Sequence, residues 1–375
     1  MPEDGKAYTI TAVSKAGVKS YMNYATSGYT LKKTDAADNS SYPETAKFVC
    51  HKLEDGKYVF VNNDGKFLTY KGGYNAAVNG NKGYTDGYTK VEYSYTDKAG
   101  ASQTTSFYPQ LFTLSKLANG SNASGVDDAY LCLLSQRANN DNAANNVYYV
   151  IKSNSNFDAG SAPYFNDTYS SAFLFEEVSY PNTVTFNAVS DVEGVSNLAT
   201  FSAPFATVIP EGVTAYYVSA ADNSKATMKA ITGEAIPANE GVLLTSESAE
   251  AVTMVPATDE ALVTIENNKL GNSAGAEKTI ADGDNAYILA NGANGTAFYK
   301  GTIGSTLKAN KAYLTLDVVG GEAISMNFGG NVTGINQIVN AEQNNAPVYD
   351  LTGRRVVRTV KGGLYIKGGN KFIAR

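Results

Sequence analysis

The 375-residue sequence has no tryptophan, one histidine and two cysteines, and only 18% of its residues are charged. Cys50 and Cys132 are far apart, and each lies in an apolar, strand-like run. This placement does not resemble a redox or zinc motif, and two buried free thiols are favoured over a single disulfide. No run of 18 apolar residues occurs, so the sequence predicts no membrane-spanning helix.

The composition that remains is typical of an all-β protein. Glycine is abundant, with 35 residues, and asparagine and threonine are frequent, which suits short strands joined by tight turns. Apolar residues do not recur with a helical period, so no amphipathic helix is predicted. The segment Met1 to Asp4 leads directly into a strand pattern, and we therefore expect that a leader peptide has been removed from the mature chain.

Charge is distributed unevenly along the chain. The formal net charge is −6, but residues 331–375 carry seven Lys and Arg against two Asp and Glu, which leaves the remaining chain near −11. An acidic body disfavours nucleic-acid binding, which needs a clustered basic face. The basic end could meet anionic surface glycans or lipid, or it could simply be a solvated tail.

Tyrosines divide the chain into regions. Nineteen of the 26 lie in residues 1–180, and a proline follows a strand-like run at Tyr180-Pro181-Asn182, which predicts a domain boundary there. Within 1–180, three segments share an aromatic-x-apolar strand pattern anchored on Phe48, Phe112 and Phe173, with spacings of 64 and 61 residues. This spacing predicts a threefold internal repeat.

Threefold repetition of hairpin-rich units resembles a ricin-type β-trefoil. Gln110-Leu111-Phe112 stands where that family has Gln-x-Trp, and the turn Asn62–Gly65 between two strand patterns supplies a hairpin after the first anchor. The resemblance covers nearly all of residues 1–180, with an insertion at 74–105 and a weaker third repeat around 127–153. A sandwich or another barrel is the alternative fold.

Residues 182–330 predict a second all-β, sandwich-like accessory domain. Two segments echo each other, Ile236–Leu244 and Leu307–Leu314, and each has an Ala-Asn turn that leads into a buried strand. The region resembles a β-domain found near the C-terminus of secreted Bacteroidetes proteins, which implies an accessory unit without assigned chemistry. Residues 331–345, rich in Asn, Gln and Gly, are predicted to be a linker.

Residues 346–375 predict a small β-meander. Short strand patterns at Val348–Leu351, Val356-Val357 and Leu364–Lys367 alternate with glycine turns. The pattern resembles the C-terminal tail of secreted Bacteroidetes proteins, which implies an export and surface-sorting signal and a location outside the cell or on its outer surface. The matching positions are Tyr349, Leu351, Gly353, Arg355, Val356, Gly363, Leu364, Tyr365 and Ile366.

The sequence offers no catalytic motif. His51 follows Cys50 on a strand, so the two side chains point to opposite faces and His51 is expected to face solvent. The carboxylate pairs Asp127-Asp128 and Glu176-Glu177 diverge in the same way, and two Asp/Asn-rich segments are interpreted as ordinary turns rather than calcium loops. We therefore predict a protein that is not an enzyme and has no cofactor, with a hydrolase built on distant carboxylates as an alternative.

Carbohydrate binding is the more specific hypothesis, because sugars are held by an aromatic face together with amide or carboxylate hydrogen bonds. The ricin-type resemblance implies an acidic residue after a second-strand position of each repeat. That position falls at Asn23, beside Tyr21 and Tyr24, and at Thr69, beside Tyr70. The alternative stacking platforms are Tyr74, Tyr84 and Tyr88. We predict a secreted protein that binds glycan or another surface ligand, with an adhesive or structural spacer as the alternative.

Overall fold

A computed structural model describes residues 1–25, 28–33, 41–69, 83–97, 99–118, 127–134, 149–153, 156–160, 162–258, 262–317, 320–328, 348–349, 355–356, 364–367 and 370–373. The chain divides into two compact units, residues 1–327 and 328–375. Strands dominate both, and the only helix among the described residues is the 3-10 turn η1 (Glu44–Ala46). The prediction of an all-β protein is confirmed.

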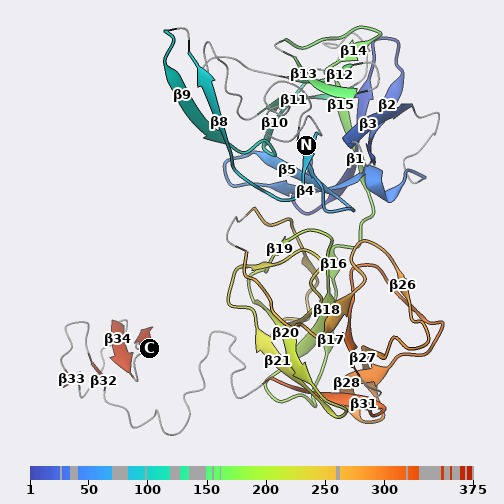
Figure 1. Ribbon diagram of the computed structural model, residues 1–375, viewed down its shortest axis with the longest axis vertical. Coiled ribbons are helices and arrows are strands. Elements are labelled where there is room, and N and C mark those ends of the chain that lie inside the picture. The colour runs from blue at the N-terminus through green and yellow to red at the C-terminus, as the bar shows by residue number, and fades with distance from the viewer. Residues whose placement is uncertain are drawn as a thin grey trace. The chain divides into compact units, whose positions relative to one another are not determined.

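Six strands of residues 1–178 pair into a closed ring (Figure 1). Each strand pairs antiparallel with the next, and the last returns to the first. In ring order they are β1 (Ala7–Val13), β4 (Lys47–Lys52), β5 (Tyr58–Asn62), β10 (Phe112–Lys116), β11 (Tyr130–Leu134) and β15 (Phe173–Val178). Closure leaves the ring without an exposed edge strand, which removes a template for aggregation.

Three hairpin-like insertions interrupt the ring at regular places. They are β2 (Lys19–Ala25) with β3 (Gly28–Lys33), β6 (Phe67–Leu68) with β7 (Tyr84–Thr85), and β12 (Tyr149–Ser153) with β13 (Asn156–Gly160) and β14 (Tyr169–Ser170). A further hairpin, β8 (Val91–Thr96) with β9 (Ser102–Phe107), forms a separate two-stranded sheet. It begins inside the predicted insertion and extends two residues beyond its predicted end.

The strand register repeats three times around the ring. The six ring strands form three successive pairs, β1–β4, β5–β10 and β11–β15, and in each pair a buried tyrosine of one strand lies directly opposite a buried phenylalanine of the other. The pairs are Tyr8 with Phe48, Tyr58 with Phe112, and Tyr130 with Phe173. The three phenylalanine anchors predicted from spacing therefore occupy equivalent positions, and each shares its position with a tyrosine that the sequence pattern did not single out.

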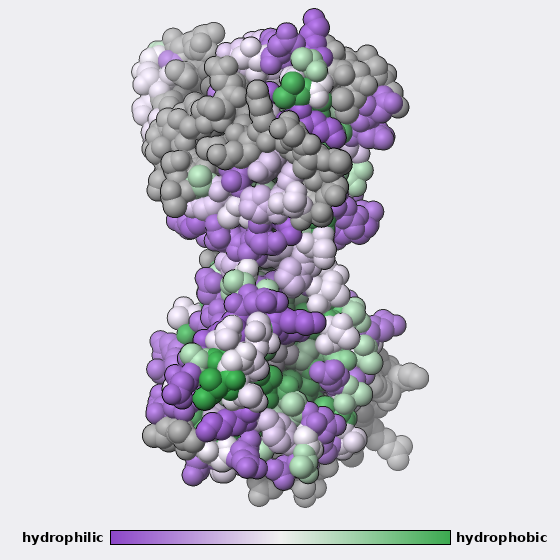
Figure 2. Space-filling view, turned by 90° about the vertical axis from the view of Figure 1, so that its right-hand side faces the viewer, coloured by the Kyte–Doolittle hydropathy of each residue, from purple (hydrophilic) through white to green (hydrophobic). Residues whose placement is uncertain are grey.

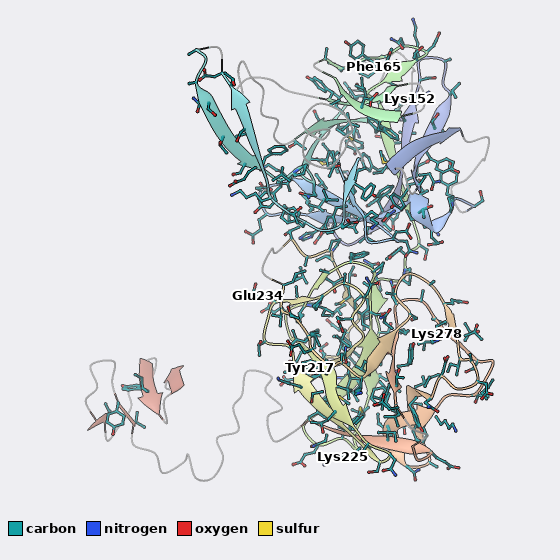
Figure 3. The ribbon with its side chains drawn as sticks, viewed as in Figure 1. Lys152, Phe165, Tyr217, Lys225, Glu234 and Lys278 are labelled. Carbon is teal, nitrogen blue, oxygen red and sulfur yellow. The ribbon has the colours of Figure 1, made fainter. Side chains whose placement is uncertain are left out.

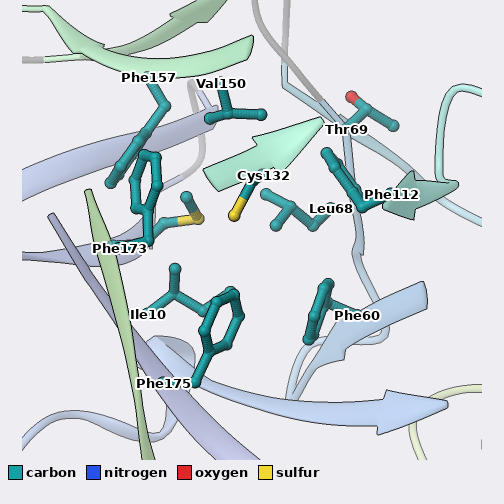
Figure 4. Close-up of a pocket in the computed structure, with 11 residues that line it drawn as sticks. Ile10, Phe60, Leu68, Thr69, Phe112, Cys132, Val150, Phe157, Phe173 and Phe175 are labelled. Carbon is teal, nitrogen blue, oxygen red and sulfur yellow. The ribbon is translucent and has the colours of Figure 1, made fainter. Parts of the chain in front are cut away.

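The interior of the ring is apolar and nearly filled (Figure 4). A cavity of about 20 Å³ remains at its centre, large enough for one water molecule. Ile10, Phe60, Cys132 and Phe173 are among its lining residues. Cys50 and Cys132 are both free and buried, as predicted, and burial raises the pKa of both thiols.

Residues 197–315 contain the same six-strand unit twice. In each copy the first strand pairs with the sixth, the second with the fifth, and the third with both the fourth and the sixth. The first copy is β18 (Asn197–Phe201), β19 (Thr207–Val208), β20 (Val213–Ala221), β21 (Lys225–Ala230), β22 (Ala235–Ile236) and β23 (Val242–Ser246). The second is β25 (Leu270–Asn272), β26 (Lys278–Thr279), β27 (Ala286–Gly292), β28 (Gly295–Lys300), β29 (Thr306–Leu307) and β30 (Ala312–Thr315).

The two predicted Ala-Asn turns stand at matching places in the two copies. Asn239 and Asn310 both have left-handed backbones, with φ of 61° and 59°. The N–H of Asn239 donates to the carbonyl of Ala203, and that of Asn310 to the carbonyl of Ser273, each just beyond the first strand of its copy. Asparagine tolerates this conformation better than other residues that have a side chain, which accounts for the echo in the sequence.

The second β-region differs from a simple two-sheet sandwich. Strand β31 (Ala323–Asn327) pairs parallel with β21 and antiparallel with β28, so hydrogen bonds link the two copies into one ten-stranded path that also includes β17 (Asn187–Ala188). A short pair, β16 (Thr183–Val184) with β24 (Val252–Thr253), stands apart from this path. The non-local parallel pair is the reason that the local pattern did not reveal this connection.

The strands before and after the predicted boundary near Tyr180 belong to different sheets, but they share one hydrophobic core. A buried cluster includes Val61 of the ring and Phe67 of β6 together with Phe201 and Leu244 from the first copy. The turn at Gly65 approaches this region so closely that a Cβ there would overlap the carbonyl oxygen of Pro204. The two β-regions of residues 1–327 are therefore packed as one body.

Polar contacts also cross this boundary. Asn63 Nδ2 donates to the carbonyl of Gly275 at 2.6 Å, and Tyr180 Oη donates to Asn63 Oδ1 at 2.9 Å. Asn182 Nδ2 donates to the carbonyl of Gly5 at 2.7 Å.

On the face shown in Figure 2, hydrophilic side chains cover most of the described surface, and hydrophobic ones gather over part of the second region.

The tail forms its own small sheet. It consists of β32 (Val348–Tyr349), β33 (Arg355–Val356), β34 (Leu364–Lys367) and β35 (Asn370–Ile373), in the order β33-β32-β34-β35. The predicted meander is wrong in one respect, because β34 pairs with β32 rather than with its sequence neighbour β33. Strand β35 was not predicted, and the predicted linker 331–345 lies outside the described residues.

Candidate functional site

Strand β2 presents two of the predicted sugar-binding residues on its outer face. Its side chains alternate, so that Ser20 and Met22 are buried while Tyr21 and Asn23 are half-buried. Met22 packs into the core of the ring, which holds the strand in this register. Tyr21 and Asn23 therefore share one face of the strand.

The 3-10 turn η1 and the residues before it lie beside this face. Tyr21 stacks on Tyr42, with ring centroids 4.1 Å apart and ring planes 17° apart. Tyr42 is buried, so the pair holds Tyr21 in a fixed orientation. A ring that is already ordered loses little conformational entropy when a ligand packs against it.

An amide and a hydroxyl lie next to the stacked rings. Thr45 Oγ1 donates to Asn23 Oδ1 at 2.7 Å, which orients the side-chain amide of Asn23. The Nδ2 of Asn23 has no hydrogen-bond partner among the described residues. Glu44 of η1 forms an ion pair of 2.5 Å with Lys47, the first residue of β4. We call Tyr21, Asn23, Tyr42 and Thr45 the β2–η1 surface.

Tyr24 makes a different contact from its two neighbours. Its ring packs edge-on against Tyr84 of the second hairpin, with centroids 5.2 Å apart. Burial, followed by a hydrogen bond with Tyr84, raises the pKa of Tyr24 to about 12. Lys66 lies over the other ring, with Nζ 5.6 Å from the Tyr84 centroid. Tyr24 therefore links the first and second hairpins and is less available to a ligand than Tyr21.

Thr69 is not part of the β2–η1 surface. It is buried, it lines the small interior cavity, and its N–H donates to the carbonyl of Gly83 at 2.9 Å. The structure therefore places Thr69 inward, beside Leu68 at the cavity, which argues against its predicted role as a ligand-binding residue. Tyr70 and the alternative platform Tyr74 lie outside the described residues.

Tyr42 and Thr45 are the members of the β2–η1 surface that the sequence analysis missed. They precede β4, and β2 and β4 are both neighbours of β1, which brings the two segments together. The only local signal is Pro43, which favours an extended residue before it and a turn after it. A proline at that place cannot reveal which strand the turn will meet.

The one histidine forms a hydrogen bond with a carboxylate rather than facing solvent freely. His51 Nδ1 lies 2.8 Å from Asp4 Oδ1, and the N–H of Lys52 donates to the same oxygen at 2.8 Å. Burial opposes ionisation of Asp4, but the hydrogen bonds from His51 and Lys52 outweigh it and leave the pKa of Asp4 lowered. The pair fixes the N-terminal segment to β4, with Cys50 buried on the opposite face of that strand.

Charged side chains elsewhere are spread out. Lys225, Glu234 and Lys278 lie apart on the second region (Figure 3). In the described part of the chain, no group of three or more His, Cys, Asp and Glu is placed to hold a metal ion. Nor does any helix there have the length and hydrophobicity that a membrane crossing requires.

In comparisons with known proteins, no protein-family model matches the chain, and no curated protein matches its sequence. The β2–η1 surface, with an ordered aromatic pair beside an oriented amide, is the described arrangement that best agrees with the predicted ligand chemistry.

Proposed function

We propose that this protein binds glycan without catalysis, through the β2–η1 surface of its N-terminal region. The observation that carries the proposal is the stacked pair Tyr21–Tyr42 beside the Asn23–Thr45 hydrogen bond. An ordered ring offers a flat apolar face to the C–H side of a sugar, and an amide offers donors to its hydroxyls. Tyr21 and Asn23 lie two residues apart on the same face of β2, so that one sugar ring could contact both.

We further propose that residues 1–180 are a β-trefoil of the ricin type. A six-stranded ring, three hairpin-like insertions and the threefold register of tyrosine opposite phenylalanine support this assignment. Gln110 also supports it. Its side chain is buried, and its Nε2 donates to Thr85 Oγ1 at 2.9 Å, so it joins the end of one repeat to its hairpin.

The tail supports a proposal about location. Its resemblance to sorting tails of secreted Bacteroidetes proteins, together with its separation as a small compact unit, favours delivery to the cell surface. Residues 328–375 would then direct the export and sorting of residues 1–327. Fusion of residues 328–375 to a heterologous secreted reporter tests this, because a sorting signal would retain the reporter at the surface of a host that has the matching machinery.

Glycan-array binding by the full chain tests the central proposal. We expect Tyr21→Ala and Asn23→Ala each to reduce binding at least tenfold. The matched controls are Tyr164→Ala, which removes an exposed tyrosine of the third repeat, and Asn223→Ala, which removes an exposed asparagine of the second region. Equal binding by all four variants would overturn the β2–η1 surface as the site.

A rigid adhesive spacer is the second candidate function. The shared core of the two β-regions favours it, because a body without a flexible joint holds its ends at a fixed separation. Absence of binding to any arrayed glycan, together with attachment of cells or host matrix to the intact chain, would favour the spacer. Cleavage of a polysaccharide by the pure protein would overturn both non-catalytic functions.

A further inference from the structure

A second, larger cleft lies where the ring meets the first copy of the second region. Its volume is about 320 Å³, within the range that small-molecule sites occupy. Phe67, Asp86 and Tyr88 line it from the ring side, and Phe205, Ala238 and Leu262 line it from the other. The cleft is distinct from the β2–η1 surface, because it shares no lining residue with it.

One wall of the cleft is an ordered aromatic platform. The ring of Tyr88 stacks on Tyr108, with centroids 4.5 Å apart and planes 10° apart. Phe67 lies on another side, 6.4 Å away and tilted by 52°. Tyr88 is half-buried, so part of its ring remains accessible at the cleft. This is the geometry of a stacking surface whose orientation is set before a ligand arrives.

Hydrogen bonds from buried Gln110 also hold the loop that carries Tyr88. Buried Gln110 donates through Nε2 to Thr85 Oγ1 at 2.9 Å and to the carbonyl of Gly87 at 3.3 Å. Thr85 Oγ1 donates in turn to the Gly87 carbonyl at 2.8 Å. The Gln-x-Phe segment thus positions residues 85–88 at the edge of the cleft.

Polar groups stand at the rim above this apolar floor. Asp86 is ion-paired with Lys66 at 2.5 Å, and 79% of its side chain is exposed. Exposed Thr89 and Lys90 complete the same rim. A carboxylate paired with an ammonium group can still accept hydrogen bonds from hydroxyls, and because the pair has no net charge a ligand needs no charge of its own to bind beside it.

From this arrangement we infer that the cleft is a second binding site, which takes an uncharged saccharide of one or two rings. The aromatic wall would contact the apolar face of a sugar ring, and the Asp86 carboxylate would accept hydrogen bonds from its hydroxyl groups. The small side chains of Ala206, Ala238 and Ala257 leave the cleft wide enough to hold the ring. The site is independent of the β2–η1 surface, and it stands even if that surface binds nothing.

Saturation-transfer NMR on the full chain tests this site. The probes are maltose, cellobiose, lactose and diacetylchitobiose, with digalacturonate as an anionic saccharide and N-phenyl-1-naphthylamine as an uncharged apolar probe. Ala238→Trp fills the cleft from an exposed position, and Ala249→Trp, at another exposed alanine, is the matched control. Equal urea midpoints for the two variants establish that neither has unfolded.

The expected result is that at least one uncharged disaccharide binds, that Ala238→Trp weakens it tenfold or more, and that Ala249→Trp changes it less than twofold. Asp86→Asn should weaken the same disaccharide, whereas Asp317→Asn, in a comparably exposed ion pair with Lys269, should not. These effects should persist in Asn23→Ala, which separates the cleft from the β2–η1 surface.

Several results would overturn the inference. They are no disaccharide binding that depends on Ala238, a preference for digalacturonate, and Ala238-dependent binding of the apolar probe alone. The last result would assign the cleft to an apolar side chain of a partner. A disaccharide that depends on Asn23 but not on Ala238 would support the proposed function and still overturn the cleft.

Discussion

The two β-regions of residues 1–327 are both built by repetition, but they repeat different things. The ring repeats a buried contact, a tyrosine opposite a phenylalanine, three times. The second region repeats a connection, in which an asparagine with positive φ leads into the closing strand, and it does so twice. Large aromatic pairs fill the wide centre of a ring, whereas a sheet path needs tight turns that set register.

The difference also decides how visible each repeat is in sequence. A turn residue is chosen by local backbone conformation, so Asn239 and Asn310 appear as an echo of short segments. The two residues of a buried tyrosine–phenylalanine pair are 40 to 54 residues apart in the chain, so no local pattern connects them. The sequence therefore revealed the phenylalanine of each pair but not the tyrosine. Four measurements would break or sharpen this comparison.

The largest expected effect is on the two cores. Phe173→Ala in the ring and Leu244→Ala in the second region each remove a fully buried side chain, and each should lower the free energy of unfolding by about 3–5 kcal/mol. Because a single buried cluster joins the regions, urea unfolding of residues 1–327 should remain one transition in both variants. Two separated transitions, each shifted by one variant only, would contradict a shared core.

The next effect is at the turn between β5 and β6. Gly65 and Gly56 both have positive φ, 70° and 80°, but only Gly65 lies against another backbone, that of Pro204. Gly56→Ala should cost about 1 kcal/mol from backbone strain, and Gly65→Ala should cost about 1–3 kcal/mol more because the new methyl group is overpacked. Equal losses, measured by urea denaturation, would mean that the junction is looser than described.

The two asparagine turns should differ from each other. Alanine at either position adopts a strained φ and should cost about 1 kcal/mol. Asn310 also donates through Nδ2 to the carbonyl of Pro181 at 3.0 Å and accepts from the N–H of Gly275 at 2.8 Å, and it is 2% exposed. Its loss should therefore cost about 1–3 kcal/mol more than that of Asn239.

Asn310→Gly separates the two contributions, since glycine relieves the backbone strain while the two hydrogen bonds remain absent. We expect this variant to recover only the strain. Full recovery of the free energy of unfolding in Asn310→Gly would show that the side-chain bonds to Pro181 and Gly275 contribute nothing.

The smallest effect is on pH dependence, and it compares one carboxylate from each region. The pKa of Asp4 is lowered, since bonds from His51 and Lys52 outweigh burial, and that of Asp191 is lowered chiefly by the backbone N–H of Thr296. A carboxylate with a depressed pKa stabilises the fold above its unfolded pKa of about 3.9, and this contribution is lost as pH falls through the folded value.

Asp4→Asn and Asp191→Asn should each flatten part of the decline in the urea midpoint below that pH, and the two effects should add because the sites share no partner. The amide variants should differ little from each other at neutral pH. A decline at acid pH that both variants leave unchanged would mean that other groups govern acid unfolding.

Much of the fold followed from local pattern. The strand that follows Met1 to Asp4, the turn at Asn62–Gly65 and the three phenylalanine anchors were all predicted, because alternation, turn residues and aromatic spacing are local properties. The misses were non-local. The parallel pairing of β21 with β31, the order of the tail strands and the inward turn of Thr69 depend on partners that are distant in the chain.

The candidate site divides in the same way. Tyr21 and Asn23 share a face because a strand alternates, which a sequence reveals. Tyr42, Thr45 and the cleft between Tyr88 and Ala238 exist only because strands far apart in sequence become neighbours.

The amino-acid sequence by itself determined the class of this protein: short strands, tight turns, few ionisable side chains and a basic end. The tertiary structure alone decided that six strands close into a ring, that a second region packs on its turn at Gly65, and that this contact leaves a cleft. The physical reason is that turn and strand preferences act over a few residues, whereas ring closure, packing and cavities depend on contacts between segments that are distant in the chain. A local sequence pattern does not show which distant segments will meet.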